Sequence, residues 1–231
     1  MKLKFPNIDE IEERQKQENH FAKGCNFYKL FWIFFVGCFL GVVVETIWCI
    51  VVHHKFESRV GLIYGPFNLV YGFGALAMVL GLNWMRKRRD FWILLAGTVI
   101  GTIVEYICSF VQQSAFGSLS WDYSEFTVNI FGRVSLLYSL FWGILAIVWV
   151  RWIYPLMVNG ISKIPNKVGK ILTWVLLVFM VFNTVMSGLA VKRWEMRILG
   201  DAPTSSVWEF FDTHYPNEKM KKIYANMSFQ D

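Results

Sequence analysis

The sequence predicts an all-α protein: a polytopic transmembrane helical bundle of about five spans, with a tandem parallel helix–loop–helix repeat. Composition is the first reason, because hydrophobic residues fill 55% of the 231 positions and charged residues 17%, whereas soluble domains carry roughly 25% charge. The second reason is a series of apolar runs, each close to the roughly 20 residues that cross a bilayer. The 11 Trp, 21 Phe and 9 Tyr suit a chain anchored at two membrane interfaces.

In chain order, a polar segment, a membrane bundle and a polar tail are expected. Residues 1–27 are polar, and we expect no cleavable signal peptide because the first apolar run is long enough to span. The bundle covers residues 28–191 and the tail residues 192–231. The expected spans are about residues 28–52, 62–84, 91–111, 131–154 and 171–191.

Lysine and arginine gather in two connections between spans. Residues 86–89 are all basic, and three lysines fall within residues 163–170, whereas residues 112–130 hold no basic residue. The positive-inside rule therefore predicts a multi-pass cell-membrane protein with a cytoplasmic N-terminus and with the 53–61 and 112–130 loops outside. Five spans place the tail outside too, but basic residues just after the last span favour the other side. Both placements of the tail stay open.

Several function classes find no support in the sequence. The net charge of +6 arises from short basic clusters between apolar runs, where it sets topology, so no nucleic-acid partner is expected. The four cysteines form no CxxC pair, which argues against a disulfide framework or a metal site. No Walker A, GxSxG or HExxH motif occurs, and no cofactor is expected. No nucleophile is singled out, which leans against an enzyme without excluding one.

A motif in the first span returns 60 positions later in the third. The first copy is Gly37-x-x-x-Gly41-x-x-x-Glu45-x-Ile47 and the second is Gly97-x-x-x-Gly101-x-x-x-Glu105-x-Ile107. Each copy is followed by a loop and another span, so the repeat units are about residues 28–84 and 91–154. Two spans per unit preserve orientation, and parallel repeats are therefore predicted.

The spacing of four places each glutamate on the same helix face as its two glycines. Such small-residue stripes let helices approach closely in lipid, so Gly37, Gly41, Gly97 and Gly101 are predicted packing positions. Glu45 and Glu105 then point into the bundle. Because a charge inside a bilayer costs at least ~2.5 kcal/mol, such groups usually mark a pathway or a site. A purely structural pair is the alternative.

Further polar residues gather in the predicted outer halves of the spans. Tyr64, Asn68 and Tyr71 recur at helical spacing in the second span. Asp122 and Tyr123 lie in the outer loop between the third and fourth spans. There an interfacial anchor is an equally good interpretation. Asn129 and Arg133, four apart, should share a face where the fourth span begins. Arg133 is the expected counter-ion of a nearby carboxylate.

At these positions the sequence resembles a known family, the bacterial ABC-transporter permeases (type IV), which are small polytopic membrane proteins. The matching segments are 41–46, 61–67, 71–74, 121–124 and 129–133. The likeness covers about residues 28–155, although residues 68–70 depart from the family's pattern. It implies a transport-related protein of a bacterial cell membrane. An ATPase or another membrane subunit is the expected partner, beside the lipid bilayer itself.

The leading hypothesis is a transporter or permease component whose polar pocket, in the outer half of the bundle, binds a small or amphipathic solute. Glu45 and Glu105 would handle protons or cations or contact the ligand. The first alternative is a membrane-embedded enzyme acting on a lipid or lipid-linked substrate at the outer leaflet, with Asn129 and Arg133 holding its headgroup. The second is a non-catalytic membrane assembly subunit. The sequence does not identify the substrate, the energy source or the oligomeric state.

Overall fold

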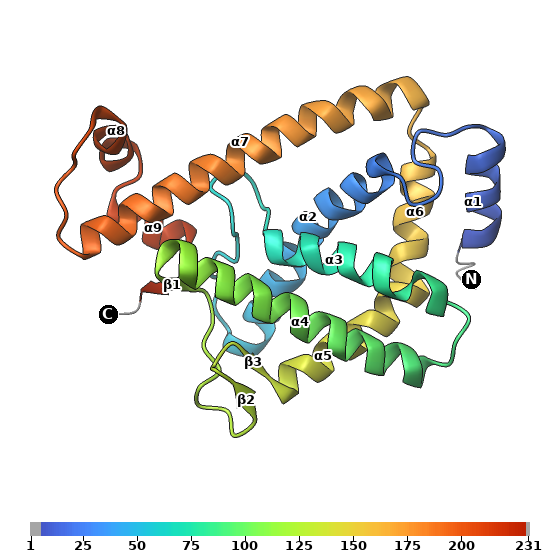
Figure 1. Ribbon diagram of the computed structural model, residues 1–231, viewed down its shortest axis with the longest axis horizontal. Coiled ribbons are helices and arrows are strands. Elements are labelled where there is room, and N and C mark those ends of the chain that lie inside the picture. Colours follow the sequence, from blue (N-terminus) through green and yellow to red (C-terminus); the bar gives the residue numbers. More distant parts are fainter. Residues whose placement is uncertain (1–5, 230–231) are drawn as a thin grey trace.

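The computed structural model describes residues 6–229 and is mostly helical, which confirms the predicted all-α class (Figure 1). Its α-helices are α1 (Ile8–Gln17), α2 (Phe27–His53), α3 (Leu69–Leu82), α4 (Asp90–Phe116), α5 (Leu136–Val148), α6 (Tyr154–Ser162), α7 (Asn166–Ile198), α8 (Ser206–His214) and α9 (Asn217–Ile223). A 3-10 turn, η1 (Asn83–Met85), and a π-helical turn, η2 (Trp149–Ile153), extend two of them. The short strands are β1 (Ser118–Leu119), β2 (Asn129–Ile130), β3 (Val134–Ser135) and β4 (Ser228–Phe229).

Within the described residues, four helices are long and apolar enough to cross a membrane: Phe27–Val52, Asp90–Phe116, Leu136–Ser162 and Asn166–Ile198. They correspond to the first, third, fourth and fifth predicted spans. The helix equivalent to the second span is shorter and covers Leu69–Met85. At 1.5 Å per residue it is ~25 Å long, less than the ~30 Å hydrocarbon core.

The second predicted span is wrong at its beginning, because residues 62–68 are not helical. Gly65 has a φ of +77°, a left-handed conformation that glycine adopts readily, and Pro66 follows it. The Asn68 side chain then caps α3 by accepting a hydrogen bond from the Val70 amide at 3.1 Å. An apolar run that contains such signals is a loop followed by a short helix.

The start of the fourth predicted span is also different. Residues 129–135 form the β2–β3 hairpin, in which Phe131 and Gly132 both have positive φ, as a tight hairpin turn requires. The helix begins only after the cap at Ser135 and continues past Tyr154 to Ser162. Its π-helical turn lies just before Pro155, which has no amide hydrogen to donate to the preceding turn.

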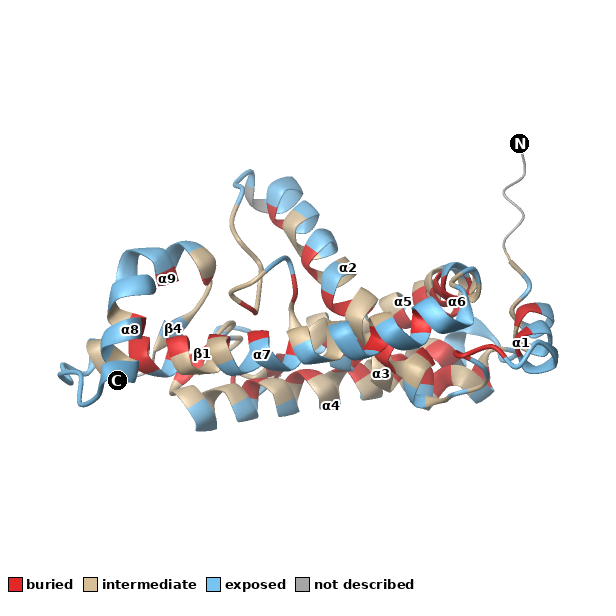
Figure 2. Cartoon of the chain, turned by 90° about the horizontal axis from the view of Figure 1, so that it is seen from above, coloured by how far each residue is buried: buried red, intermediate tan, exposed pale blue. Residues whose placement is uncertain are grey.

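The membrane helices form two tightly packed pairs. α2 packs along α3, α4 packs along α5, and α3 joins the pairs by packing against α4. The long helix α7 contacts both α2 and α4, and it runs along the upper edge of the view in Figure 1. Figure 2 shows α2 rising away from the layer that contains α4, α5 and α7, and the side chains near its C-terminal end are mostly exposed. Lipid is the natural cover for such apolar surface.

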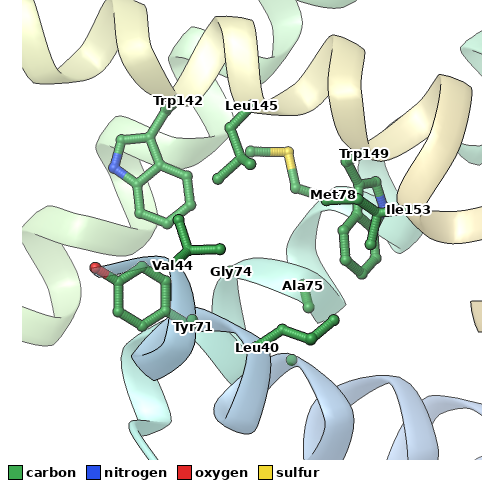
Figure 3. A pocket seen from close by; sticks show the side chains of 12 residues that line it. Leu40, Val44, Tyr71, Gly74, Ala75, Met78, Trp142, Leu145, Trp149 and Ile153 are labelled. Carbon is green, nitrogen blue, oxygen red and sulfur yellow. The ribbon is translucent and has the colours of Figure 1, made fainter. Parts of the chain in front are cut away.

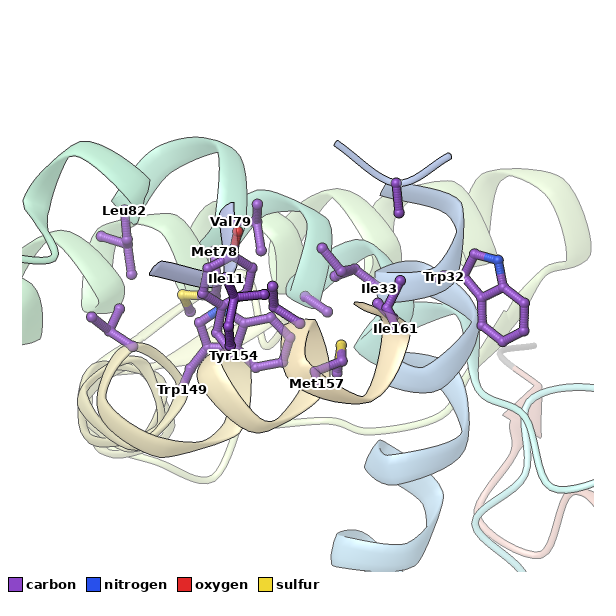
Figure 4. Close-up of a cluster of buried hydrophobic side chains, with 14 of the residues drawn as sticks. Ile11, Trp32, Ile33, Met78, Val79, Leu82, Trp149, Tyr154, Met157 and Ile161 are labelled. Atoms are coloured by element: carbon purple, nitrogen blue, oxygen red, sulfur yellow. The ribbon is translucent and has the colours of Figure 1, made fainter. Parts of the chain in front are cut away.

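A hydrophobic core joins the N-terminal segment to one end of the bundle (Figure 4). Ile11 of α1 packs there with side chains from α2, α3, η2 and α6, among them Ile33, Met78, Trp149 and Tyr154. Ion pairs support the contact, since Glu12 lies 3.1 Å from Arg86 and 3.7 Å from the fully buried Lys29. The basic loop 86–89 and the N-terminal segment therefore lie at the same end.

The C-terminal tail folds back onto the opposite end of the bundle. β4 pairs antiparallel with β1, and the Asn226 side chain donates a hydrogen bond to the Ser120 carbonyl at 3.0 Å. A second core forms between α7, α8 and α9, around Trp194, Phe211 and Met220. These contacts place the tail on the same side as the 117–135 loop.

Candidate functional site

Glu105 is buried between α4, α5 and the loop that joins them, with 6% of its surface exposed. Its Oε1 accepts a hydrogen bond from the Tyr123 hydroxyl at 2.9 Å. Its Oε2 accepts one from the Trp142 indole N–H at 3.1 Å. Both carboxyl oxygens thus have an aromatic donor, which offsets part of the cost of burying the group.

Glu45 lies at the corresponding depth of α2 but is more open, with 25% of its side chain exposed. Its Oε2 accepts a hydrogen bond from the Tyr71 hydroxyl of α3 at 2.8 Å. Its Oε1 lies 3.9 Å from a guanidinium nitrogen of Arg59, in the segment between α2 and α3. One aromatic donor and one cation therefore surround this carboxylate.

The two carboxylate clusters are neighbours through their aromatic donors. The rings of Tyr71 and Trp142 lie 6.3 Å apart between centroids. Both line a small apolar cavity of about 80 Å³ between α2, α3 and α5, together with Leu40, Met78 and Trp149 (Figure 3). At ~30 Å³ for each water molecule, this volume corresponds to two or three waters, so the cavity is too small for a larger solute.

All four glycines of the duplicated motif lie where two helices cross. A Cβ added at Gly37 would lie 2.7 Å from the Ala75 methyl group, and one at Gly97 would overlap Ala146. A Cβ at Gly41 would overlap the Tyr71 ring, and one at Gly101 the Trp142 side chain. Because these glycines have no side chain, α3 can approach α2 closely and α5 can approach α4 closely. This approach brings the aromatic donors to the glutamates.

Arg133 lies away from the carboxylates that it was expected to balance. Its guanidinium donates hydrogen bonds to the Ser109 hydroxyl at 3.3 Å and to the Gln113 side chain. It also stacks over the rings of Tyr106 and Phe110, with the guanidinium carbon 5.8 and 5.5 Å from their centroids. Residue 133 follows the turn of the β2–β3 hairpin. Its side chain therefore lies against α4 and does not point into the interior of the helix bundle.

Asp122 and Asn129 shape the loop between α4 and α5. Asp122 accepts hydrogen bonds from the Ser124 hydroxyl at 2.6 Å and from its amide at 2.9 Å, and these bonds lower the pKa of the Asp122 carboxyl. Asn129 accepts from the Gly132 amide at 2.9 Å and donates to the Phe126 carbonyl at 2.7 Å. Asn129 and Arg133 share no helix face, contrary to the prediction, because no helix begins there.

Tyr64 and Asn68 belong to the extended segment before α3 and so do not continue the helix face of Tyr71. Asn183 of α7 binds the Tyr64 backbone twice, accepting from its N–H at 3.1 Å and donating to its carbonyl at 2.7 Å. The Ser187 hydroxyl accepts from the Ile63 amide at 2.9 Å. Two polar residues of α7 thus hold an irregular segment that lipid could not satisfy.

A separate cleft of about 680 Å³ lies between α3, α4 and α7, and we call it the lateral cleft. Exposed apolar side chains line it, including Phe73, Leu80, Ile107 and Val111. Its polar lining is Asn68, Gln112, Ser120, Thr184, Ser187, Tyr224 and Asn226. Of the predicted site residues, Asn68 alone lines this cleft, and Glu45 and Glu105 do not.

Several residues of these sites were not found from the sequence. Arg59 and Trp142 contact the two glutamates. Arg59 occurs in a loop, and Trp142 is one of several aromatic residues in an apolar span. Tyr224 and Asn226 of the tail are distant in sequence from the bundle. A Trp-Gly pair at 142–143 beside the Tyr-Gly pair at 71–72 was the one available signal. No group of three metal-ligating side chains comes together within residues 6–229.

Comparison with other proteins supports the resemblance seen at the sequence level. Neither the curated proteins nor the solved structures contain a match to this chain. The profile of a family described as "Putative ABC-transporter type IV" matches residues 32–188. This is more than half of the chain and includes both helix pairs with most of α7. The chain therefore belongs to the Putative ABC-transporter type IV family.

Proposed function

We propose that this multi-pass membrane protein is a transport component that binds an amphipathic solute in the lateral cleft. The observation that carries the proposal is the cleft itself. Its volume of about 680 Å³ falls within the range of 300–1,000 Å³ found for sites that hold small molecules. Its walls combine a long apolar surface with a few hydrogen-bonding groups, which is the pattern that an amphipathic molecule matches.

The cleft is placed where a membrane solute could enter it. Phe73, Leu80, Ile107 and Val111 are about half exposed or more, and most of the other exposed residues of α3 and α4 are apolar. A molecule dissolved in the bilayer would therefore reach the cleft from the side. With the N-terminus in the cytoplasm, as the basic loops favour, the cleft lies in the outer half of the bundle.

The two helix pairs act, in this proposal, as copies of one ancestral unit. Beside the glycine–glutamate motif of α2 and α4, the partner helices carry Tyr71-Gly72-x-x-Ala75 and Trp142-Gly143-x-x-Ala146. Each aromatic residue packs on the second glycine of its pair and donates to its glutamate. Two packed units joined side by side are a common basis for rocking motions in transporters.

Glu45 and Glu105 are, in the same proposal, proton- or cation-handling groups at the junction of the copies. Glu45 is partly exposed and paired with Arg59, so it has the more direct access to the outer side. An ATPase or another membrane subunit would supply energy from the basic end of the bundle. The lipid-enzyme alternative has less support, because both glutamates already accept hydrogen bonds from fixed aromatic partners and neither lines the cleft.

Native mass spectrometry of the purified protein tests the proposal by counting retained membrane lipids or other small molecules. Ala77→Trp, which fills the cleft, should remove at least one tightly retained molecule. Gly188→Leu is a second filling variant, because a Cβ there meets only the Phe116 ring at 3.4 Å. Val99→Trp is the control, since Val99 is 59% exposed on α4 and does not line the cleft. Equal retention by wild type and both filling variants would refute the proposal.

A further inference from the structure

The lateral cleft is lined without charge. None of its lining residues within the described part of the chain is Asp, Glu, Lys or Arg. Its hydrogen-bonding groups are hydroxyls and amides. A buried phosphate or carboxylate would find no counter-ion there, and leaving an ionised group unpaired in an apolar site costs several kcal/mol.

One of the lining hydroxyls has unused hydrogen-bonding capacity. Tyr224, just after α9, is 3% exposed, and its hydroxyl makes no hydrogen bond with the described residues. The Ser187 hydroxyl is its polar neighbour. Because Ser187 accepts from the Ile63 amide and donates to the Asn183 side chain at 3.3 Å, it can only accept from Tyr224. The lone pairs of the Tyr224 oxygen stay free in either case, and a polar hydrogen of a ligand would satisfy them.

Three further polar residues of the lining, Gln112, Ser120 and Asn226, are linked to one another at the end of the cleft where β1 pairs with β4. Asn226 is two residues further along the tail than Tyr224 and binds the Ser120 carbonyl. Gln112 and Ser120 exchange hydrogen bonds of 2.9 and 3.1 Å. Most of the polar groups thus lie at the β1–β4 end of the cleft, and the apolar walls of α3 and α4 extend away from it. The cleft has a head end and a chain end.

We infer that the lateral cleft selects a lipid-like molecule with an uncharged hydrogen-bonding headgroup, such as a hydroxyl, ester or amide, and that the Tyr224 hydroxyl contacts this headgroup. The inference rests on the proposed function, because it names the class of solute for the same cleft. It also gives the tail a role: the segment after α9 contributes the head end of the site. Diacylglycerols, long-chain alcohols and ceramide-like lipids share this chemistry.

Two probes with the same acyl chains separate headgroup selection from chain binding. Delipidated full-length protein in micelles is titrated with dioleoylglycerol and with dioleoylphosphatidylglycerol, and bound lipid is counted by native mass spectrometry. We expect dioleoylglycerol to bind about tenfold more tightly or better, since one buried unpaired charge costs at least that much. Tyr224→Phe should weaken dioleoylglycerol binding about three- to tenfold, the effect of one hydrogen bond, and leave phosphatidylglycerol binding unchanged.

Tyr215→Phe is the matched control, because Tyr215 lies in the same tail, bonds to the Tyr64 hydroxyl at 2.5 Å and does not line the cleft. It should leave both affinities unchanged. Equal or tighter binding of phosphatidylglycerol at a site that Ala77→Trp removes would overturn the headgroup inference and leave the proposed function standing. Binding of both lipids that Ala77→Trp does not alter would overturn the proposed function itself. An unchanged dioleoylglycerol affinity in Tyr224→Phe would exclude the contact assigned to that hydroxyl.

Discussion

Aromatic side chains hold the two carboxylates inside the bundle. Glu105 accepts from Trp142 and Tyr123, and Glu45 accepts from Tyr71. An indole N–H and a phenol O–H can donate a hydrogen bond without adding a charge. They therefore suit the interior of a membrane bundle, where burying a basic side chain beside the glutamate would itself cost free energy. The glycine one turn before each glutamate makes this possible, because it lets the aromatic ring approach the helix.

Trp142→Phe should destabilise the protein by about 1–3 kcal/mol, since it leaves one oxygen of the buried Glu105 carboxylate without its donor. Trp174→Phe is the matched control, because Trp174 is 53% exposed on α7 and should change stability by no more than about 0.5 kcal/mol. Thermal unfolding in detergent measures both. In a Glu105→Leu background the effect of Trp142→Phe should shrink; an undiminished effect would show that the indole acts by packing alone.

At the level of single residues, the sequence identified the acceptors better than their donors. Glu45 and Glu105 are predictable because ionisable residues are rare inside spans and these two recur in a motif. Trp142 is not, because apolar helices contain many aromatic residues and only the fold shows which one reaches a carboxylate. Arg133 is the expected counter-ion because it is the only basic residue between Asp90 and Arg151, but a hairpin turns its side chain toward Ser109 and Gln113.

The paired helices α2–α3 and α4–α5 are the elements that carry the two carboxylate clusters. Four of the five predicted spans appear as long apolar helices, because length and hydropathy determine such spans almost alone. The second span was placed too early, since hydropathy does not register the conformational effect of Gly65 and Pro66. The start of the fourth span was predicted too early for a related reason, because hydropathy does not distinguish a hairpin with apolar residues from a helix. The boundaries of these two spans could therefore not be predicted from hydropathy alone, because residues that favour turns determine where the helices begin.

Gly101→Ala should destabilise the α4–α5 pair and Gly41→Ala the α2–α3 pair, because the added methyl group overlaps the Trp142 or Tyr71 side chain. We expect about 1–3 kcal/mol for each, as for overpacked cores. Gly160→Ala is the control within α6, where a Cβ meets nothing within 4 Å, and it should be neutral or stabilising by up to ~1 kcal/mol. The measurement is the unfolding temperature of the three variants. If Gly101→Ala and Gly41→Ala unfold at the same temperature as Gly160→Ala, the close packing at Gly101 and Gly41 is contradicted.

The tail is held to α7 by a pH-sensitive ion pair. Arg193, which is 2% exposed, donates to both oxygens of Asp212 at 2.8 and 2.7 Å, and Arg197 adds a bond of 2.6 Å. The hydrogen bonds from Arg193 hold the pKa of the Asp212 carboxyl below its ordinary value. A depressed folded-state pKa means that the stabilisation is complete above the unfolded value of about 3.9 and is lost as the pH falls through the folded value.

Asp212→Asn should therefore lower the unfolding temperature at pH 7, by an amount equivalent to about 3 kcal/mol. The difference from wild type should narrow only as the pH falls below about 4. Glu209→Gln, an exposed change in the same helix, should show no such pH dependence. A difference that stayed constant from pH 7 to pH 3 would mean that the ion pair does not contribute.

Taken as a whole, the molecule has a basic end and a cleft end. The basic loop 86–89 and α1 lie at one end, and the 117–135 loop and the tail lie at the other. The sequence could not place the tail, because basic residues follow the last apolar run directly and lie in the final turns of α7. Their positions become understandable from the fold: Arg193 and Arg197 bind Asp212 within the tail and so do not report on topology.

Cysteine labelling in intact cells tests this arrangement. Three single-cysteine variants are compared, in which all other cysteines are replaced by alanine. One keeps Cys25, which is exposed and free. The other two carry Ser124→Cys in the loop or Ser205→Cys in the tail. A membrane-impermeant maleimide should label residues 124 and 205 in intact cells and residue 25 only after permeabilisation. Labelling of residues 124 and 205 from opposite sides would contradict the pairing of β1 with β4.

The central claim is that the lateral cleft binds an amphipathic molecule of the membrane. The most direct measurement is a structure of the full chain extracted with its surrounding lipids and without detergent exchange. We expect density for a chain-shaped molecule between α3, α4 and α7, with its polar end beside Tyr224 and Asn226. A cleft closed by its own side chains, with lipid density confined to the outer perimeter of the helices, would contradict the claim.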